Sequence, residues 1–116
     1  MEELLNTALV GMNSVIKKSP EYNTIKIRQK NITINSSDAS MLLIDFLSEV
    51  LTLSHTKKSI FTKAEFHNIK DNYLNFSIDG FKVDGFDEDI KAVTYTETEI
   101  TKNAAGLLEA IIVFDI

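Results

Sequence analysis

Apolar residues at helical spacing predict a first helix at the start of the chain. They recur from Glu2 to about Ile16, and polar residues occupy the other side of this segment. Ser19-Pro20 ends the helix, because proline lacks a backbone donor and restricts the residue before it. Gly11 lies inside the helix, where glycine costs about 1 kcal/mol relative to alanine, so we expect it to mark a close approach to another backbone.

A second, more apolar helix is expected after residue 36. Ser36 or Ser37 should cap it, with Asp38 in the first turn, where a negative charge is favourable, and it should run to about Leu53. Most of its surface is apolar, so it should lie across a sheet. The exceptions form one narrow polar stripe: Asp45, Ser48, Glu49 and Thr52.

The pattern between and after the helices is that of β-strands. Residues 24–35 change phase between Ile27 and Ile32, which requires a bulge or a tight turn near residues 29–31, and we prefer the bulge. Residues 60–67 and the alternating segment 73–79 should form an antiparallel hairpin, with Asp79-Gly80 opening a loop after it.

Two further strands, at residues 90–101 and 106–116, complete the chain. One face of the last strand is apolar throughout and should meet the core, whereas the other is apolar in the middle and acidic at its end. This favours a strand inside the sheet that reaches the rim. The chain therefore predicts a single α+β domain, residues 1–116, with two helices packed against a mixed β-sheet in two layers. The core-facing residues of the last strand are Leu108, Ala110, Ile112, Phe114 and Ile116.

Composition removes several classes of function. The chain has 116 residues, of which 44% are hydrophobic and 25% charged, as in an ordinary globular domain. No apolar run approaches a membrane span, and Glu2 and Glu3 stand where a secretory signal would carry basic residues, so we expect a cytoplasmic protein. The absence of cysteine excludes disulfides, thiolate catalysis and zinc–thiolate sites. A net charge of −5, with no basic run longer than Lys57-Lys58, disfavours direct nucleic-acid binding.

The C-terminus carries the candidate chemistry. The Asp115 side chain and the terminal carboxylate of Ile116 occupy adjoining positions and repel each other unless a cation lies between them. Ca²⁺, Mg²⁺ and Mn²⁺ prefer such oxygen ligands. The alternative is a frayed terminus with an ordinary surface aspartate. Lys91 opens an otherwise apolar strand, either as a charge at the strand mouth or as a cation near the acidic terminus.

Other polar residues give weaker signals. His55 and His67 are the only histidines, and they lack the spacing of a ligand pair. Glu49 is either a partly buried ligand or base, or a solvent-facing carboxylate of the polar stripe. The acidic loop at residues 84–89 does not have the spacing of an EF-hand. We assign no catalytic residue.

Segments along the whole chain resemble archease. The main ones are Asp-Ile-Lys-Ala-Val-Thr-Tyr at 89–95 and the terminal Val-Phe-Asp-Ile at 113–116, joined by the helical segments near 2–12 and 38–51. The resemblance implies a small α+β cytoplasmic protein that activates an RtcB-type RNA ligase in tRNA splicing. Such a protein promotes guanylylation and turnover of the ligase and performs no bond chemistry itself.

The resemblance also implies site residues. The family holds a metal ion, usually calcium, and two of its ligands map onto Asp115 and the carboxylate of Ile116, while its functional lysine maps onto Lys91. A further ligand belongs to an N-terminal His-Thr-Ala-Asp strand, which is missing here. Either the true start lies upstream of Met1 or this chain is a degraded variant. We expect the former, because a sheet without that strand exposes an apolar edge. An intact mass matching residues 1–116 from the native source would contradict this.

Two other functions remain open at this point. The first is a generic chaperone or interaction module with an incidental acidic C-terminus. The second is a small hydrolase with Glu49 or a histidine as base, although no nucleophile motif accompanies them. The sequence leaves open the oligomeric state, the metal and the contact surface for the ligase.

Overall fold

A computed structural model describes residues 1–17, 25–95, 100–102, 104–110 and 112–116, without the side chains of Tyr95 and Glu109. Its two helices pack against β-structure, so the predicted α+β class is confirmed. The described strands pair only in antiparallel fashion, in the orders β1-β3-β2, β4-β7 and β5-β6. In chain order the elements are α1 (Glu2–Ile16), β1 (Lys26–Asn35), α2 (Ala39–Lys57), β2 (Ser59–Ile69), β3 (Tyr73–Lys82), β4 (Ala92–Tyr95), β5 (Thr101–Lys102), β6 (Leu108–Glu109) and β7 (Ile112–Asp115).

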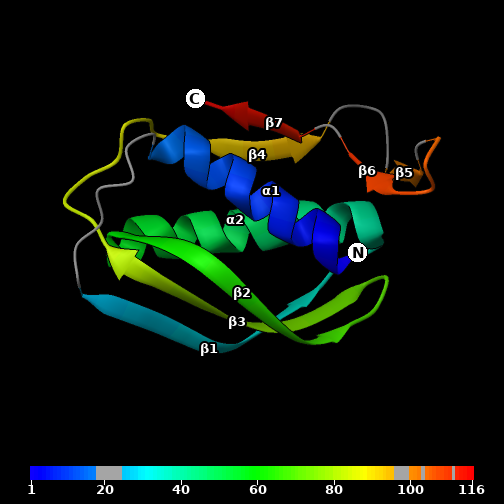
Figure 1. Ribbon diagram of the computed structural model, residues 1–116, viewed down its shortest axis with the longest axis horizontal. Coiled ribbons are helices and arrows are strands. Elements are labelled where there is room, and N and C mark those ends of the chain that lie inside the picture. The colour runs from blue at the N-terminus through cyan, green and yellow to red at the C-terminus, as the bar shows by residue number, and fades with distance from the viewer. Residues whose placement is uncertain (18–24, 96–99, 103, 111) are drawn as a thin grey trace.

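The helices lie between the three-stranded sheet and the β4–β7 pair (Figure 1). Helix α2 contacts all three strands of the large sheet and also β4. Contact on opposite sides explains why α2 is apolar around most of its circumference. None of the described helices is long and apolar enough to cross a membrane.

The core is formed by one stripe of α1, most of α2 and the inner face of the sheet. Helix α1 buries Leu5, Leu9, Met12 and Ile16, which follow one another at helical spacing. Phe46 of α2 packs edge-on against Phe76, with ring centroids 5.0 Å apart. The ring centroid of Phe66 lies 5.8 Å from that of Phe46. Such tilted aromatic contacts add roughly 0.5–1.5 kcal/mol to the burial of the rings.

Helix α1 has its predicted bounds, but both ends of α2 differ from the expectation. Asp38 is the N-cap, and its Oδ1 accepts a 2.9 Å hydrogen bond from the backbone N–H of Met41. The Ser36 hydroxyl donates instead to Asp45 Oδ2, 2.6 Å away. The predicted serine cap was therefore wrong, because Ser36 is engaged with the side of the helix.

The C-terminal end of α2 extends to Lys57 rather than Leu53. Ser54 is fully buried, and His55 and Lys57 lie in the last turn, where cations are favourable. Lys58 adopts a left-handed conformation, with φ of 48°, and ends the helix. The last turn of α2 is polar, so the spacing of apolar residues does not show where the helix ends.

The two expectations for the large sheet are confirmed. The register of β1 against β3 shifts between Gln29 and Ile32, which is the predicted bulge, and Asn31 there has a φ of 54°. Strands β2 and β3 form the predicted antiparallel hairpin. Residue 24, included in the first predicted strand, lies outside the described residues.

The close backbone approach that was expected at Gly11 occurs at Gly80 instead. A Cβ on Gly11 would meet nothing within 4 Å, so the expected close backbone approach is absent there. Gly80 was expected to open a loop, but β3 continues through it to Lys82. A Cβ on Gly80 would overlap the Ile60 carbonyl oxygen and lie 2.7 Å from Phe61 Cα. Glycine permits this close approach of β2 and β3.

The C-terminal half is more divided than predicted. The expected strand at residues 90–101 is represented by β4 and β5, with residues 96–99 outside the described part. The expected strand at 106–116 is represented by β6 and β7. Ala110, Ile112 and Phe114 pack against the core as predicted, but Leu108 and Ile116 are 37% and 58% exposed. Among the described strands β7 pairs only with β4, so it lies at a sheet edge instead of inside the sheet.

Candidate functional site

The pairing of β4 with β7 brings Lys91 to Asp115. Ala92 lies opposite Asp115 and Val93 opposite Phe114, so the start of β4 adjoins the end of β7. The backbone N–H of Lys91 donates to the carbonyl oxygen of Asp115 over 2.6 Å. A lysine and two carboxylate-bearing residues, from segments far apart in the sequence, therefore meet at one end of this strand pair (Figure 1). We call Lys91, Asp115 and Ile116 the C-terminal tip.

The segment that leads to Lys91 is anchored on the ends of both helices. The N–H of Val83 donates to the carbonyl of Lys58, and that of Asp87 donates to the carbonyl of Ile16, over 2.9 and 2.8 Å. At the end of α2, His55 lies 5.0 Å from Phe86 and its Nε2 lies 3.7 Å from an Asp89 carboxylate oxygen. These contacts fix the approach to Lys91.

The C-terminal tip itself is open to solvent. Lys91, Asp115 and Ile116 are exposed, whereas their neighbours Ile90 and Val93 are buried, at 2% and 6% exposure. Along β7, Ile112 and Phe114 turn towards the core and Val113 and Asp115 turn away from it. Buried neighbours thus hold an exposed group of charges that a partner can reach.

The chemistry of the C-terminal tip suits a hard cation, but the number of ligands is insufficient. Asp115 and the carboxylate of Ile116 supply the oxygen ligands that Ca²⁺ prefers, and Ca²⁺ takes 6–8 oxygens. No group of three or more His, Cys, Asp or Glu side chains in the described residues could hold a metal. The two carboxylates could therefore provide part of a coordination shell.

Glu49 does not occupy an enclosed catalytic site. It is exposed, at the edge of a hollow of about 380 Å³ between α2 and β1, which Asp45, Ser48 and Thr52 also line. Asp45 accepts the hydrogen bond from Ser36. These positions agree with the solvent-facing polar stripe, one of the two alternatives for Glu49.

A serine, a histidine and a glutamate meet on β2 and β3, in an order that resembles a hydrolytic triad. His67 Nε2 lies 2.9 Å from Ser77 Oγ, but His67 Nδ1 is 3.8 Å from Glu65 Oε1, too far for a hydrogen bond. Ser77 is 1% exposed, and its Oγ also accepts from the backbone N–H of Asn31. A buried hydroxyl with two partners has a structural role here, because no substrate can reach it.

Sequence reasoning missed an ion-pair network on the outer face of the sheet. Arg28 NH1 lies 2.6 Å from Asp79 Oδ2, and NH2 lies 3.2 Å from Glu65 Oε2. Arg28 donates these hydrogen bonds, and the bond to Asp79, followed by the bond to Glu65, raises the pKa of Arg28 above its usual value. Alternation on β2 and β3 placed these acids on the outer face, but no sequence signal paired them with β1.

A family model, curated relatives and a solved structure all resemble this chain. The Archease protein family (MTH1598/TM1083) matches residues 1–116. The protein archease of Methanosarcina barkeri is 33% identical over 120 residues, which cover 97% of this chain and 81% of the relative. The protein archease of Methanosarcina mazei is 28% identical over 124 residues, which cover 97% of this chain and 82% of the relative. The solution structure of Methanobacterium thermoautotrophicum protein 1598 has a TM-score of 0.62 and 26% identity, covering 99% of this chain and 84% of that protein.

Proposed function

This chain belongs to the archease family, and we propose that it is a cytoplasmic protein cofactor that activates an RtcB-type RNA ligase in tRNA splicing. It promotes guanylylation and turnover of the ligase and forms or breaks no bond itself. The observation that carries the proposal is the C-terminal tip, where the β4–β7 pairing holds an exposed lysine beside two carboxylates. The family match over the whole chain supports it as well.

The structure of the C-terminal tip suits docking rather than catalysis. Lys91 and Asp115 carry opposite charges on neighbouring backbone positions, so a partner surface must match both signs to bind well. Their exposure keeps the charges solvated before docking, and the anchored segment before Lys91 limits the ordering that docking requires. The tip then biases the arrangement of the ligase active site by binding one of its states more tightly.

We also propose that Asp115 and the Ile116 carboxylate bind a divalent cation, with Ca²⁺ first and Mg²⁺ or Mn²⁺ as alternatives. Because the described residues supply only part of the shell, we expect weak binding by the isolated protein, in the millimolar range typical of low-charge sites. Calorimetric titration of CaCl₂ measures this affinity, and Asp115→Asn should abolish the heat. If wild type and variant give the same titration, the cation does not bind at the C-terminal tip.

An extension of the chain beyond Ile116 provides a direct test of the proposed function. One alanine added after Ile116 moves the terminal carboxylate by about 3.3 Å along the strand and leaves every side chain in place. We expect the extended protein to stimulate guanylylation of the ligase at least about tenfold less, equivalent to roughly 1.4 kcal/mol of coupling. Transfer of radioactive GMP to the ligase measures this effect. Equal stimulation by parent and extended chain would contradict a role for the terminal carboxylate.

A generic interaction module remains the second candidate. Ile116 of the C-terminal tip and Val113 close to it are 58% and 44% exposed, and such apolar groups favour protein contacts of low specificity. This candidate expects suppression of aggregation of an unrelated unfolded protein, independent of divalent cations. A turbidity assay with Asp115→Asn distinguishes the two, because the module would keep its full effect.

A further inference from the structure

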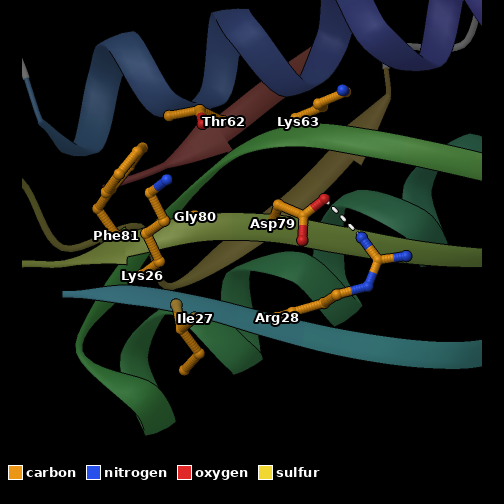
Figure 2. A pocket seen from close by; sticks show the side chains of 8 residues that line it. All are labelled: Lys26, Ile27, Arg28, Thr62, Lys63, Asp79, Gly80 and Phe81. Carbon is orange, nitrogen blue, oxygen red and sulfur yellow. Dashed lines mark hydrogen bonds and ion pairs between the residues drawn. The ribbon is translucent and has the colours of Figure 1, made fainter.

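Three cations gather on the outer face of the three-stranded sheet. Lys26 and Arg28 come from β1 and Lys63 from β2, and we call these three residues the cationic patch. Arg28 and Lys63 both lie opposite Asp79 of the central strand β3, which places them in one row across the sheet. Lys26 is two residues from Arg28 on the same strand, so its side chain points to the same face. Figure 2 shows the three residues lining a hollow of about 390 Å³.

The charges of this protein are separated in space. The whole chain has a net charge of −5. The strands of the large sheet have the opposite balance, because Glu65 and Asp79 are their only acidic residues, and both pair with Arg28. Within the described part of the chain, no carboxylate lies at ion-pair distance from Lys26 or Lys63. The basic residues of these strands are Lys26, Arg28, Lys30, Lys63 and Lys82.

Arg28 is held in place but keeps donors for a ligand. Its NH1 and NH2 atoms donate to Asp79 and Glu65, while a guanidinium carries five N–H groups in all. The two carboxylates fix the plane of the group, and its side chain remains 35% exposed. Its remaining N–H groups are preoriented for a phosphate, while Asp79 and Glu65 offset its charge, so the excess positive charge of the cationic patch comes from Lys26 and Lys63.

We propose that the cationic patch binds the phosphate backbone of a single-stranded RNA. The choice of RNA over another polyanion rests on the proposed function, since the ligase acts on RNA. Lys26 and Arg28 are spaced by about 6.6 Å along an extended strand, which suits charges that repeat along a chain. The large sheet, which carries the cationic patch on β1 and β2, and the β4–β7 pair, which carries the C-terminal tip, lie on opposite sides of the helices (Figure 1), so bound RNA leaves the tip free for the ligase.

Lysines on sheet edges have another role, because they prevent edge-to-edge association of strands. Strands β1 and β2 are the two edges of this sheet. That role explains isolated lysines on either edge, but it does not require two acids to hold Arg28 in place. Edge protection alone predicts no RNA binding, whereas the proposal predicts RNA binding that depends on Lys26 and Lys63.

Fluorescence anisotropy of a labelled oligouridylate of about 12 nucleotides tests the proposal with the protein alone. We expect binding at low salt, with log K falling against log salt with a slope of about −2, as three phosphate contacts would give. Lys26→Ala with Lys63→Ala should weaken binding at least tenfold and make the slope shallower by about 1.4. The matched control removes two exposed lysines elsewhere, with Lys70→Ala and Lys102→Ala, and should change binding less than twofold.

Each outcome of this experiment decides the proposal. No binding at low salt, or equal weakening in both double variants, would overturn it and leave the lysines as edge protection. Loss of ligase binding without loss of RNA binding in the Lys26/Lys63 variant would assign the cationic patch to a protein partner instead. Asp115→Ala should bind RNA normally while failing to activate the ligase, so failure of the proposed function would be seen separately.

Discussion

Asp115→Ala should remove most of the stimulation of ligase guanylylation, by about a hundredfold or roughly 2.7 kcal/mol. The substitution deletes one of the two carboxylates of the C-terminal tip and with it the proposed cation site. Asp115 is exposed, and its backbone carbonyl, not its side chain, accepts the hydrogen bond from Lys91. The fold should therefore be unaffected, and the measurement is GMP transfer to the ligase at saturating protein.

The matched control for this variant is Asp71→Ala. Asp71 is an exposed acid in the turn between β2 and β3, so the control removes the same charge away from the C-terminal tip. We expect it to stimulate the ligase as the parent does. Circular dichroism should give one spectrum for all three proteins. Undiminished stimulation by Asp115→Ala would reject the C-terminal tip as the activating site.

Local patterns in the sequence were sufficient to predict the elements that depend on near neighbours. A change of apolar phase between Ile27 and Ile32 predicted a bulge or a tight turn, and the structure has the preferred bulge in β1. The bounds of α1 follow from a single apolar stripe. In both cases the residues that support the prediction all lie within the strand or helix that they predict.

The ends of α2 could not be predicted in the same way. Ser54 is buried although it is polar, because β-structure packs on more than one side of this helix. The cap depends on whether Ser36 or Asp38 finds the helix N-terminus, and Asp45 decides this by accepting from Ser36. Such outcomes depend on tertiary contacts.

The C-terminal tip was partly accessible from sequence because its two carboxylates are adjacent along the chain. The nearness of Lys91 requires the antiparallel pairing of β4 with β7, which the sequence did not specify. The network around Arg28 was missed altogether, since its partners lie 51 and 37 residues away. Net charge disfavours nucleic-acid binding by the chain as a whole, but a sum over the chain contains no information about where the cations lie, so the proposed RNA contact at the cationic patch remains to be tested.

Gly80→Ala should be the most destabilising single methyl addition in the large sheet. The new Cβ would overlap the Ile60 carbonyl oxygen and lie 2.7 Å from Phe61 Cα, and backbone atoms cannot move aside as a side chain can. We expect a loss of at least about 3 kcal/mol in the free energy of unfolding.

Gly11→Ala is the control for that variant, because it makes the same chemical change where a Cβ meets nothing within 4 Å. Alanine is favoured over glycine inside a helix, so this variant should gain up to about 1 kcal/mol. Urea denaturation followed by circular dichroism measures both changes. Opposite signs for the two variants are expected because β2 and β3 approach closely at Gly80, whereas the helix surface at Gly11 is open. A neutral Gly80→Ala would show that β2 and β3 leave room for a methyl group at this position.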